Sequence, residues 1–182
     1  AVAMDGSTRL TAAEFFLMLD RVAPRRNVFP WDAQTWPPTI DLVLFVHRVE
    51  GLPGGLYCLV RDPDRLGTLK ESLSAEFHWA KAAGSPDHLP LYLLEKGDVR
   101  SAAAGGSCGQ DIAADGVFAV AMLAEFENPI REGGPWFYRR LHWEAGAVGQ
   151  LLYLEAEAAG VQATGIGCFF DDALHELIGI EG

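Results

Sequence analysis

The spacing of hydrophobic residues changes between helical and strand-like patterns along the chain, which predicts a mixture of helices and strands. The first helix is expected to begin at Thr8 or Thr11, because apolar residues then recur on one helical face. The apolar residues of this face are Ala12, Phe15, Phe16 and Leu19. Glu14 stands three residues after Thr11, which is the spacing of a capping box.

Short, continuous apolar runs predict the strands. Residues 41–49 form a buried strand by length and β-branched content, and a glycine-rich turn at 51–55 leads into a second strand at 56–61. These two strands should pair as a hairpin. Further strands are predicted at 89–94, 117–125 and 161–166, and the middle one is apolar enough to lie at the centre of a sheet.

Helical patterns are interspersed with these strands, whereas residues 23–38, rich in Pro, Arg and Trp, predict a loop without regular structure. Helices are expected from Asp64 or Gly67 to Leu73, over 102–114, from Pro135 to about Gly160, and over 171–178. The long helix expected from Pro135 to about Gly160 is apolar on nearly every face, so it lies either centrally or in an interface. An ordinary core helix is the alternative. The whole pattern predicts an α+β fold with a mixed sheet.

Size and charge narrow the class of protein. A chain of 182 residues fits one domain with a substantial core, so we expect residues 1–182 to form a single domain. A net charge of −11 argues against nucleic acid as a partner, and no apolar run is long enough to predict a membrane span. The chain starts at Ala1 rather than Met and stops directly after a helical pattern, so we expect a fragment or one half of a longer chain.

The three cysteines, Cys58, Cys108 and Cys168, form no C-x-x-C motif and cannot all pair with one another. We therefore expect reduced thiols and a cytoplasmic protein. Cys108 stands at an expected helix start, where a thiolate would be favoured, but a buried structural cysteine is the preferred interpretation.

A glycine-spaced turn, Thr164-Gly165-Ile166-Gly167-Cys168, precedes an acidic helix start at Asp171 and Asp172. Two of its positions carry no Cβ, which would let backbone N–H groups approach a flat or anionic ligand. The alternative is a tight strand-to-helix turn that binds nothing.

Four motifs carry a resemblance to a known family. They are Gly51-Leu-Pro-Gly-Gly-Leu-Tyr-Cys58, Gly109-Gln110-Asp-Ile-Ala-Ala114, Tyr138-Arg139 followed by Glu144-Ala-Gly146, and Gln150-x-x-Tyr153-Leu-x-Ala156. Together with the glycine turn, they resemble the nitroreductase-like FMN-dependent oxidoreductases, particularly the branch of SagB-type dehydrogenases. The resemblance implies a nitroreductase-like α+β fold, with a mixed, mostly antiparallel sheet flanked by helices and a long central helix.

The same resemblance implies a flavin site. The backbone of Gly165, Ile166, Gly167 and Cys168 would face the isoalloxazine ring of FMN, with Gly167 N–H near flavin N5 and Cys168 N–H near the neighbouring carbonyl. Gln110, Arg139 and Gln150 would help to position the cofactor. NAD(P)H or a bound small-molecule or peptide substrate would reduce the flavin, an organic acceptor would reoxidise it, and a homodimer or tandem pseudo-dimer would complete the site. No catalytic side chain is identified.

The sequence departs from the family in two places. The N-terminal Arg-Arg-Ser motif that holds the FMN phosphate is absent, leaving Arg9, Arg25 and Arg26 as substitutes or surface charges. Where azoline-oxidising members carry a Lys-Tyr pair, this chain reads Arg131-Glu-Gly-Gly-Pro135, so azole formation is not expected. These departures favour the alternative, a degenerate, flavin-free domain that acts as a dimerisation or scaffold subunit.

Other catalytic chemistry finds little support. The five histidines are scattered without metal-ligand spacing, so no metal site is expected. Glu144 would be a buried acid in the long helix, and an ion pair with Arg139 or Arg140 is its preferred role. Cys168 is expected to contribute only its backbone.

Overall fold

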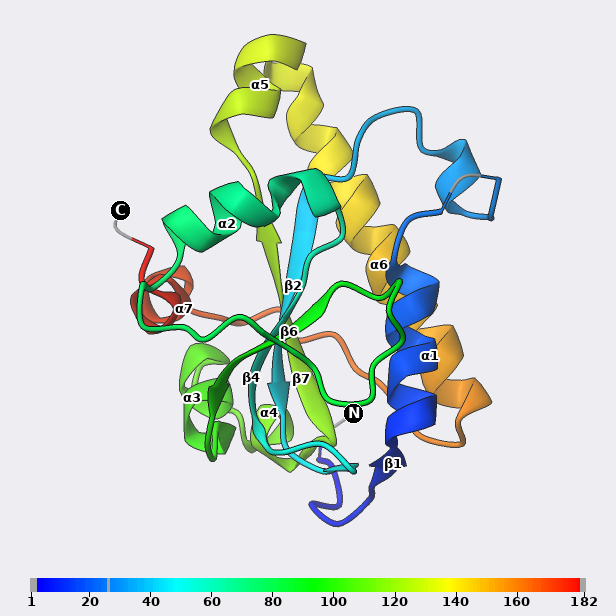
Figure 1. Cartoon of the computed structure of the whole chain (residues 1–182), viewed down its shortest axis with the longest axis vertical. Helices are drawn as coiled ribbons and strands as arrows, with labels where there is room; N and C mark the ends of the chain where they lie inside the picture. Colours follow the sequence, from blue (N-terminus) through cyan, green and yellow to red (C-terminus); the bar gives the residue numbers. More distant parts are fainter. Residues whose placement is uncertain (1–2, 26, 181–182) are drawn as a thin grey trace.

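The computed structural model describes residues 3–25 and 27–180. Its centre is an antiparallel five-stranded sheet in the order β5-β6-β4-β2-β7, with helices on both faces (Figure 1). The strands of this sheet are β2 (Ile40–Val46), β4 (Gly55–Leu59), β5 (Ala80–Lys81), β6 (Leu91–Lys96) and β7 (Phe118–Ala124). A separate parallel pair joins β1 (Leu10–Thr11) to β3 (Val49–Glu50).

Two helical layers cover the sheet (Figure 1). One layer contains α1 (Ala12–Val22) and α6 (Tyr138–Ala158). The other layer contains α2 (Leu66–Ser72), α3 (Arg100–Gly106), α4 (Asp111–Asp115) and α7 (Asp171–Ile178). The remaining helices connect these elements: α5 (Glu127–Gly133) and the short 3-10 helices η1 (Trp31–Ala33), η2 (Pro63–Arg65) and η3 (Pro135–Phe137). Within the described residues, no helix is both long and apolar enough to cross a membrane.

Strand β2 is buried along its whole length because each face of the sheet packs against one helical layer. Leu42 and Leu44 belong to the cluster that includes Phe15 of α1, whereas Val43 and Phe45 belong to the opposite cluster with residues of α2, α3 and α7. Alternate side chains of a strand point to opposite faces, so a continuous apolar run is what two covered faces require. The α+β fold expected from the sequence, with a mostly antiparallel sheet flanked by helices, is confirmed.

Local predictions at the first helix and the hairpin are confirmed. Thr11 is the N-cap of α1; its Oγ1 accepts from the N–H of Glu14 at 3.3 Å, and its N–H donates to the Glu14 carboxylate at 2.8 Å. Strands β2 and β4 pair antiparallel, with Val46 opposite Gly55. Glycine is required at Gly55, since a Cβ there would lie 2.2 Å from the backbone oxygen of Glu95.

The helix predicted over 102–114 is wrong, since two helices, α3 and α4, occupy this region. Between them, Cys108 and Gly109 have φ values of +56° and +72°. This left-handed conformation cannot continue a right-handed helix, so the chain turns there. The sequence Gly105-Gly106 leaves the helix boundary open, and the structure ends α3 at Gly106, just before the left-handed residues.

The strand predicted at 161–166 is also wrong, because the segment has no regular secondary structure and pairs with no strand of the described chain. Val161 and Ala163 pack beside Leu10 and Met18 on the α1 side, whereas Ile166 packs with the cluster on the opposite side. The segment therefore crosses from one helical layer to the other (Figure 1) and cannot stay in register with a strand.

The long helix is confirmed as η3 followed by α6, but it is preceded by α5, which the sequence pattern did not predict. The loop at 23–38 likewise contains η1. Within this chain α6 buries one side only, through Leu141, Glu144, Val148 and Ala156. Trp143 and Leu154 on its other side remain 52% and 55% exposed, so α6 is not enclosed by this chain alone.

Candidate functional site

The glycine turn 164–168 lies in the segment that joins α6 to α7, and one side chain of α6 and one that precedes α4 hold it. The N–H of Gly165 donates to the hydroxyl of Tyr153 on α6. The Nε2 of Gln110 donates to the carbonyl oxygen of Cys168 at 3.2 Å and to that of Ser107 at 2.8 Å. Both ends of the turn are therefore attached to neighbouring elements.

A disulfide bond between Cys108 and Cys168 adds a covalent attachment at the same place, with 5.9 Å between the two Cα atoms. The prediction of reduced thiols is wrong for this pair, and so are a buried structural role for Cys108 and a backbone-only role for Cys168. Cys58 is free and buried in the core, where burial raises the pKa of its thiol far above the usual value.

The middle of the turn is open. Gly167 is exposed, its φ lies outside the left-handed region, and a Cβ built on it would meet no atom within 4 Å. It forms no hydrogen bond with any residue that the structure describes. Ile166 beside it is half-buried and packs against the core below. Neither backbone conformation nor packing within the described chain explains why this position should be glycine.

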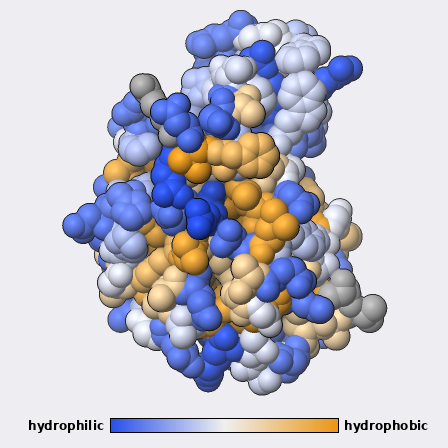
Figure 2. Space-filling model, turned by 90° about the vertical axis from the view of Figure 1, so that its right-hand side faces the viewer, coloured by the Kyte–Doolittle hydropathy of each residue, from blue (hydrophilic) through white to orange (hydrophobic). Residues whose placement is uncertain are grey.

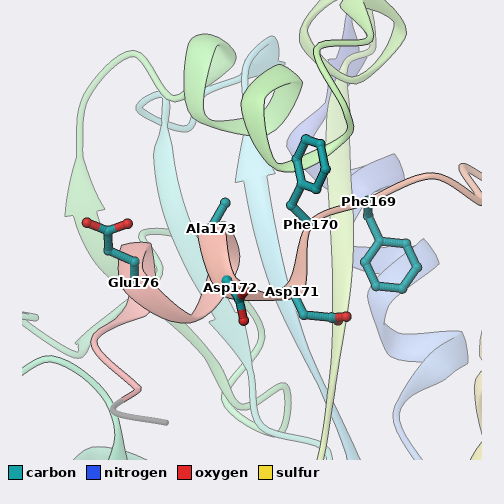
Figure 3. A pocket seen from close by; sticks show the side chains of 6 residues that line it. All are labelled: Phe169, Phe170, Asp171, Asp172, Ala173 and Glu176. Carbon is teal, nitrogen blue, oxygen red and sulfur yellow. The ribbon is translucent and has the colours of Figure 1, made fainter.

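Directly after the turn, a cavity of about 490 Å³ opens at the start of α7 (Figure 3). It is lined by Phe169, Phe170, Asp171, Asp172, Ala173 and Glu176. The ring of Phe170 points toward the layer of α3 and α4 and that of Phe169 points away from it, and both rings are more than half exposed (Figure 3). The helix begins at Asp171 as predicted. The cavity thus combines apolar surface with carboxylates.

The predicted pairing of Glu144 with Arg139 or Arg140 is wrong. Glu144 is fully buried and forms an ion pair with Arg61, which follows β4. Its carboxylate also accepts from Thr39, at 3.1 Å from the N–H and 2.9 Å from the hydroxyl. At a rise of 1.5 Å per residue, Glu144 lies about 13 Å along α6 from Tyr153, so the pair is a structural anchor away from the turn.

Arg61 is equally enclosed. Its side chain donates to the carbonyl oxygens of Val22 at 2.8 Å and Ile40 at 2.9 Å, and its guanidinium lies 4.6 Å from the ring centre of Trp31. Burial lowers the pKa of Arg61, while the Glu144 carboxylate opposes that shift. The ion pair joins α6 to α1, β2 and β4.

The other predicted positioning residues are not brought to the turn. Arg139 and Gln150 are exposed on α6 and form no hydrogen bond with residues 165–168 in the part of the chain that the structure describes. Gln150 lies about one helical turn from Tyr153, whereas Arg139 lies about 21 Å from it along the axis. Of the arginines considered for a phosphate, Arg25 pairs with Asp20 at 3.0 Å, Arg9 is exposed, and Arg26 lies outside the described residues.

Sequence reasoning missed two supports of the turn. Tyr153 appeared only as a letter of a motif, although a hydroxyl near a helix end before a glycine-rich segment is a usable signal. The Cys108–Cys168 bond spans 60 residues, and no local spacing indicates such a pair. The described residues contain no group of three or more His, Cys, Asp or Glu side chains that could share a metal ion.

Comparisons with known proteins agree with this architecture. A model of the Nitroreductase family matches residues 70–182, which include the turn, Gln110 and all of α6. The Methanocaldococcus jannaschii protein named "Putative nitroreductase MJ1384" is 31% identical over 62 residues, or 34% of this chain and 31% of that protein.

A crystal structure of a protein described as a "putative nitroreductase" from Anabaena variabilis has the same fold, with a TM-score of 0.69 and 24% identity. The match covers 98% of this chain and 32% of the other. The matched part is thus about a third of the length of either relative. Because the family model spans more than half of the sequence, including the glycine turn and the helix that holds it, this chain belongs to the nitroreductase family.

Proposed function

We propose that the chain binds FMN against the turn 164–168 and forms part of an FMN-dependent oxidoreductase. The observation that carries this proposal is Gly167: it is exposed, lies on a backbone fixed on both sides, and faces open space where a Cβ would stand. A flat ring laid on this turn would need that space. Glycine is then explained by the ligand rather than by the chain.

The residues around the turn fit such a group. Tyr153 and Gln110 hold Gly165 and Cys168, so the N–H of Gly167 is presented by a backbone that needs little rearrangement. Fixed N–H donors stabilise developing negative charge at low reorganisation cost. When bound, FMN would supply hydride transfer between NAD(P)H or a bound substrate and an organic acceptor.

Gln110, Arg139 and Gln150 are the proposed positioning residues, with unequal support. Gln110 already contacts the turn. Arg139 and Gln150 share the exposed side of α6 with Tyr153, so they would reach the cofactor only if it extends along that helix. The cavity beside Phe169 and Phe170 offers space for an organic acceptor next to the turn.

A second copy of the chain, or a tandem sister domain, is proposed as the partner. Hydrophobic residues gather in the middle of the side of the molecule that α1 and α6 form (Figure 2). Large exposed hydrophobic residues in and near η3 and α6 include Phe126, Trp136, Tyr138, Trp143 and Leu154. The rings of Phe126 and Tyr138 contact each other, as do those of Trp136 and Trp143, and contiguous exposed apolar side chains are typical of an interaction surface. Light scattering on the purified chain should give the mass of a dimer.

The motifs at Gln110 and along α6 place the chain, in this proposal, near the SagB-type dehydrogenases. Residues 1–182 would be one nitroreductase-like domain of a longer cytoplasmic protein. Azole formation is not proposed, since Arg131-Glu-Gly-Gly-Pro135 replaces the Lys-Tyr pair of the azoline-oxidising members.

Flavin retention tests the proposal. The protein is incubated with FMN and desalted, and its visible absorbance is recorded for the wild type and for Gly167→Val. We expect the wild type to retain flavin and the variant to bind it at least about tenfold more weakly, a loss of about 1.4 kcal/mol. Gly97→Val is the matched control, because Gly97 is also exposed with no atom within 4 Å of its Cβ position but lies in another turn. Equal retention by wild type and Gly167→Val would contradict the proposal.

The second candidate is a flavin-free dimerisation or scaffold domain. The positions of the arginines considered for binding the cofactor favour it, because Arg25 is already paired with Asp20 and Arg139 lies far from the turn. A folded, dimeric wild-type protein that repeatedly fails to retain FMN would support this candidate.

A further inference from the structure

The Cys108–Cys168 bond joins the glycine turn to the turn between α3 and α4. Cys168 is exposed and Cys108 is half-buried, so solvent reaches this bond. Cys58, in contrast, is enclosed in the core. The three cysteines therefore divide into an accessible pair and one inaccessible thiol.

Few other contacts fasten the same junction. The N–H of Phe170 donates to the carbonyl oxygen of Gly106 at 2.8 Å, and Gln110 donates to that of Cys168 at 3.2 Å. Cys108 itself has a φ of +56°, a conformation that non-glycine residues rarely adopt. Without the bond, two hydrogen bonds at a solvent-facing junction and the packing of half-buried Ile166 would be the contacts that hold the turn on this side within the described residues. Local opening is easiest where such contacts are few and exposed.

We propose that Cys108–Cys168 is a reversible thiol–disulfide exchange site, which an external dithiol opens and whose opening loosens the turn 164–168. Exposed disulfides are the exchangeable ones, and in a reducing compartment such bonds act transiently or as redox sensors. The ligand class is a dithiol reductant, small or carried by a protein.

The exchange balances as a two-electron reaction. One thiolate of the dithiol attacks Sγ of the exposed Cys168, forming a mixed disulfide and releasing Cys108 as a thiolate, which takes up a proton. The second thiolate of the reductant then attacks the reductant's first sulfur, which is bonded to Cys168 in the mixed disulfide. This releases Cys168 as a thiolate, which is protonated in turn. The dithiol becomes a disulfide, and the protein gains two electrons and two protons.

Native alkylation read by mass spectrometry tests the site itself. In protein equilibrated with oxidised glutathione, Cys108 and Cys168 should take no label; after treatment with dithiothreitol, both should be labelled. Cys58 should react only after denaturation. Labelling of both residues in the oxidised sample, or of neither after dithiothreitol, would overturn the proposal.

Hydrogen exchange tests whether the bond controls the turn. Amides of 164–168 should exchange at least about tenfold faster in the reduced protein, while those of α5, a helix without buried residues that opens locally, stay unchanged. Cys108→Ser should behave like reduced wild type with or without dithiol, and Cys58→Ala should respond to dithiol as wild type does. Equal exchange of the turn in both states, or an equal acceleration in α5, would refute the coupling. If Cys108→Ser does not fold, the two wild-type states still decide.

One consequence rests on the proposed function: FMN should bind at least about threefold more weakly to the reduced protein, because the turn that would receive it is less ordered. Equal affinity in both states would overturn this coupling. A protein that binds no FMN in either state would refute the flavin proposal alone, since alkylation and hydrogen exchange require no flavin.

Discussion

The chain from α6 to α7 is attached to the fold at two places of opposite character. In the first half of α6, Glu144 and Arg61 form an ion pair with both side chains completely buried. After α6, the turn 164–168 is attached through Tyr153, Gln110 and the Cys108–Cys168 bond, all at partly or fully exposed positions. The first attachment is shielded from solvent, and the second is open to it.

This difference in solvent exposure separates a fixed structural contact from contacts that ligands and reductants can change. A buried ion pair, with further hydrogen bonds to Thr39, Val22 and Ile40, holds α6 in one register against the sheet, and solutes cannot reach it. An exposed disulfide and single hydrogen bonds position the turn while leaving it open to ligands and reductants. The candidate site is thus held by a rigid element on one side and by a chemically adjustable contact on the other.

Breaking the buried attachment should have the largest effect. Arg61→Met leaves the Glu144 carboxylate buried without its cation, which typically costs about 3–5 kcal/mol of unfolding free energy. Urea unfolding followed by circular dichroism would measure this loss.

The double variant Arg61→Met/Glu144→Gln provides the control for that experiment. It removes both charges together and should recover much of the stability, because a buried pair is worth far less than the penalty of an unpaired charge. A double variant as unstable as the single one would show that the arginine acts through its contacts with Val22, Ile40 and Trp31 instead.

Breaking the exposed attachment should cost less. The Cys108–Cys168 bond spans 60 residues, and a disulfide typically stabilises a protein by about 2–4 kcal/mol because it constrains the unfolded chain. Cys168→Ser should lower the unfolding free energy by this amount in oxidising buffer. In reducing buffer, wild type and variant should unfold at nearly the same urea concentration; a persistent gap would assign the loss to packing of residue 168.

The hydrogen bond between Tyr153 of α6 and the turn should contribute less to stability than the ion pair or the disulfide. Tyr153→Phe removes the hydroxyl that accepts the N–H of Gly165 while keeping the ring, so about 0.5–1.5 kcal/mol is expected. Hydrogen exchange at Gly165 should quicken more than exchange in β2. Tyr138→Phe, an exposed tyrosine near the start of α6, is the matched control and should leave Gly165 unaffected.

The same contrast explains what the sequence could predict. The capping box at Thr11 and Glu14, the β2–β4 hairpin and the start of α7 at Asp171 depend on residues a few positions apart, and all three are confirmed. The partner of Glu144 lies 83 residues away, so helical spacing suggested the neighbours Arg139 and Arg140 in place of Arg61. Local patterns carry no information about such distant pairs.

The candidate site divides in the same way. Glycine spacing identified the turn 164–168, because an unusual backbone composition is visible in a short window. Its supports were invisible, since the contacts of Tyr153 and Cys108 with the turn depend on the path by which the segment crosses between the helical layers. That crossing also removed the strand expected at 161–166.

The smallest effect should be on the pH dependence of stability, through a histidine that connects the sheet to α4. His47 follows β2, and its Nε2 lies 2.9 Å from the carbonyl oxygen of Ala113 on α4, the helix after the Cys108 turn. Burial lowers the pKa of His47, although the bond to Ala113 opposes the shift. The unfolded chain therefore takes up this proton at a higher pH than the folded protein does. The stability that neutral His47 provides is complete above about pH 6.5 and is lost as the pH falls toward its lowered folded value.

We therefore expect wild type to lose about 2 °C more in Tm than His47→Gln between pH 7.5 and 5.5, measured by differential scanning calorimetry. Glutamine can still donate to Ala113 but does not titrate, so the variant isolates the proton from the hydrogen bond. His78→Gln, at an exposed position, should keep the wild-type pH dependence. If His47→Gln follows the same curve as wild type, α4 is held independently of this proton. The buried carboxyl group of Asp41, whose pKa burial raises, is then the next group to test. That group works in the opposite direction, since a raised carboxyl pKa favours the folded state at low pH and loses its contribution as the pH rises, so the sign of the measured slope distinguishes the two.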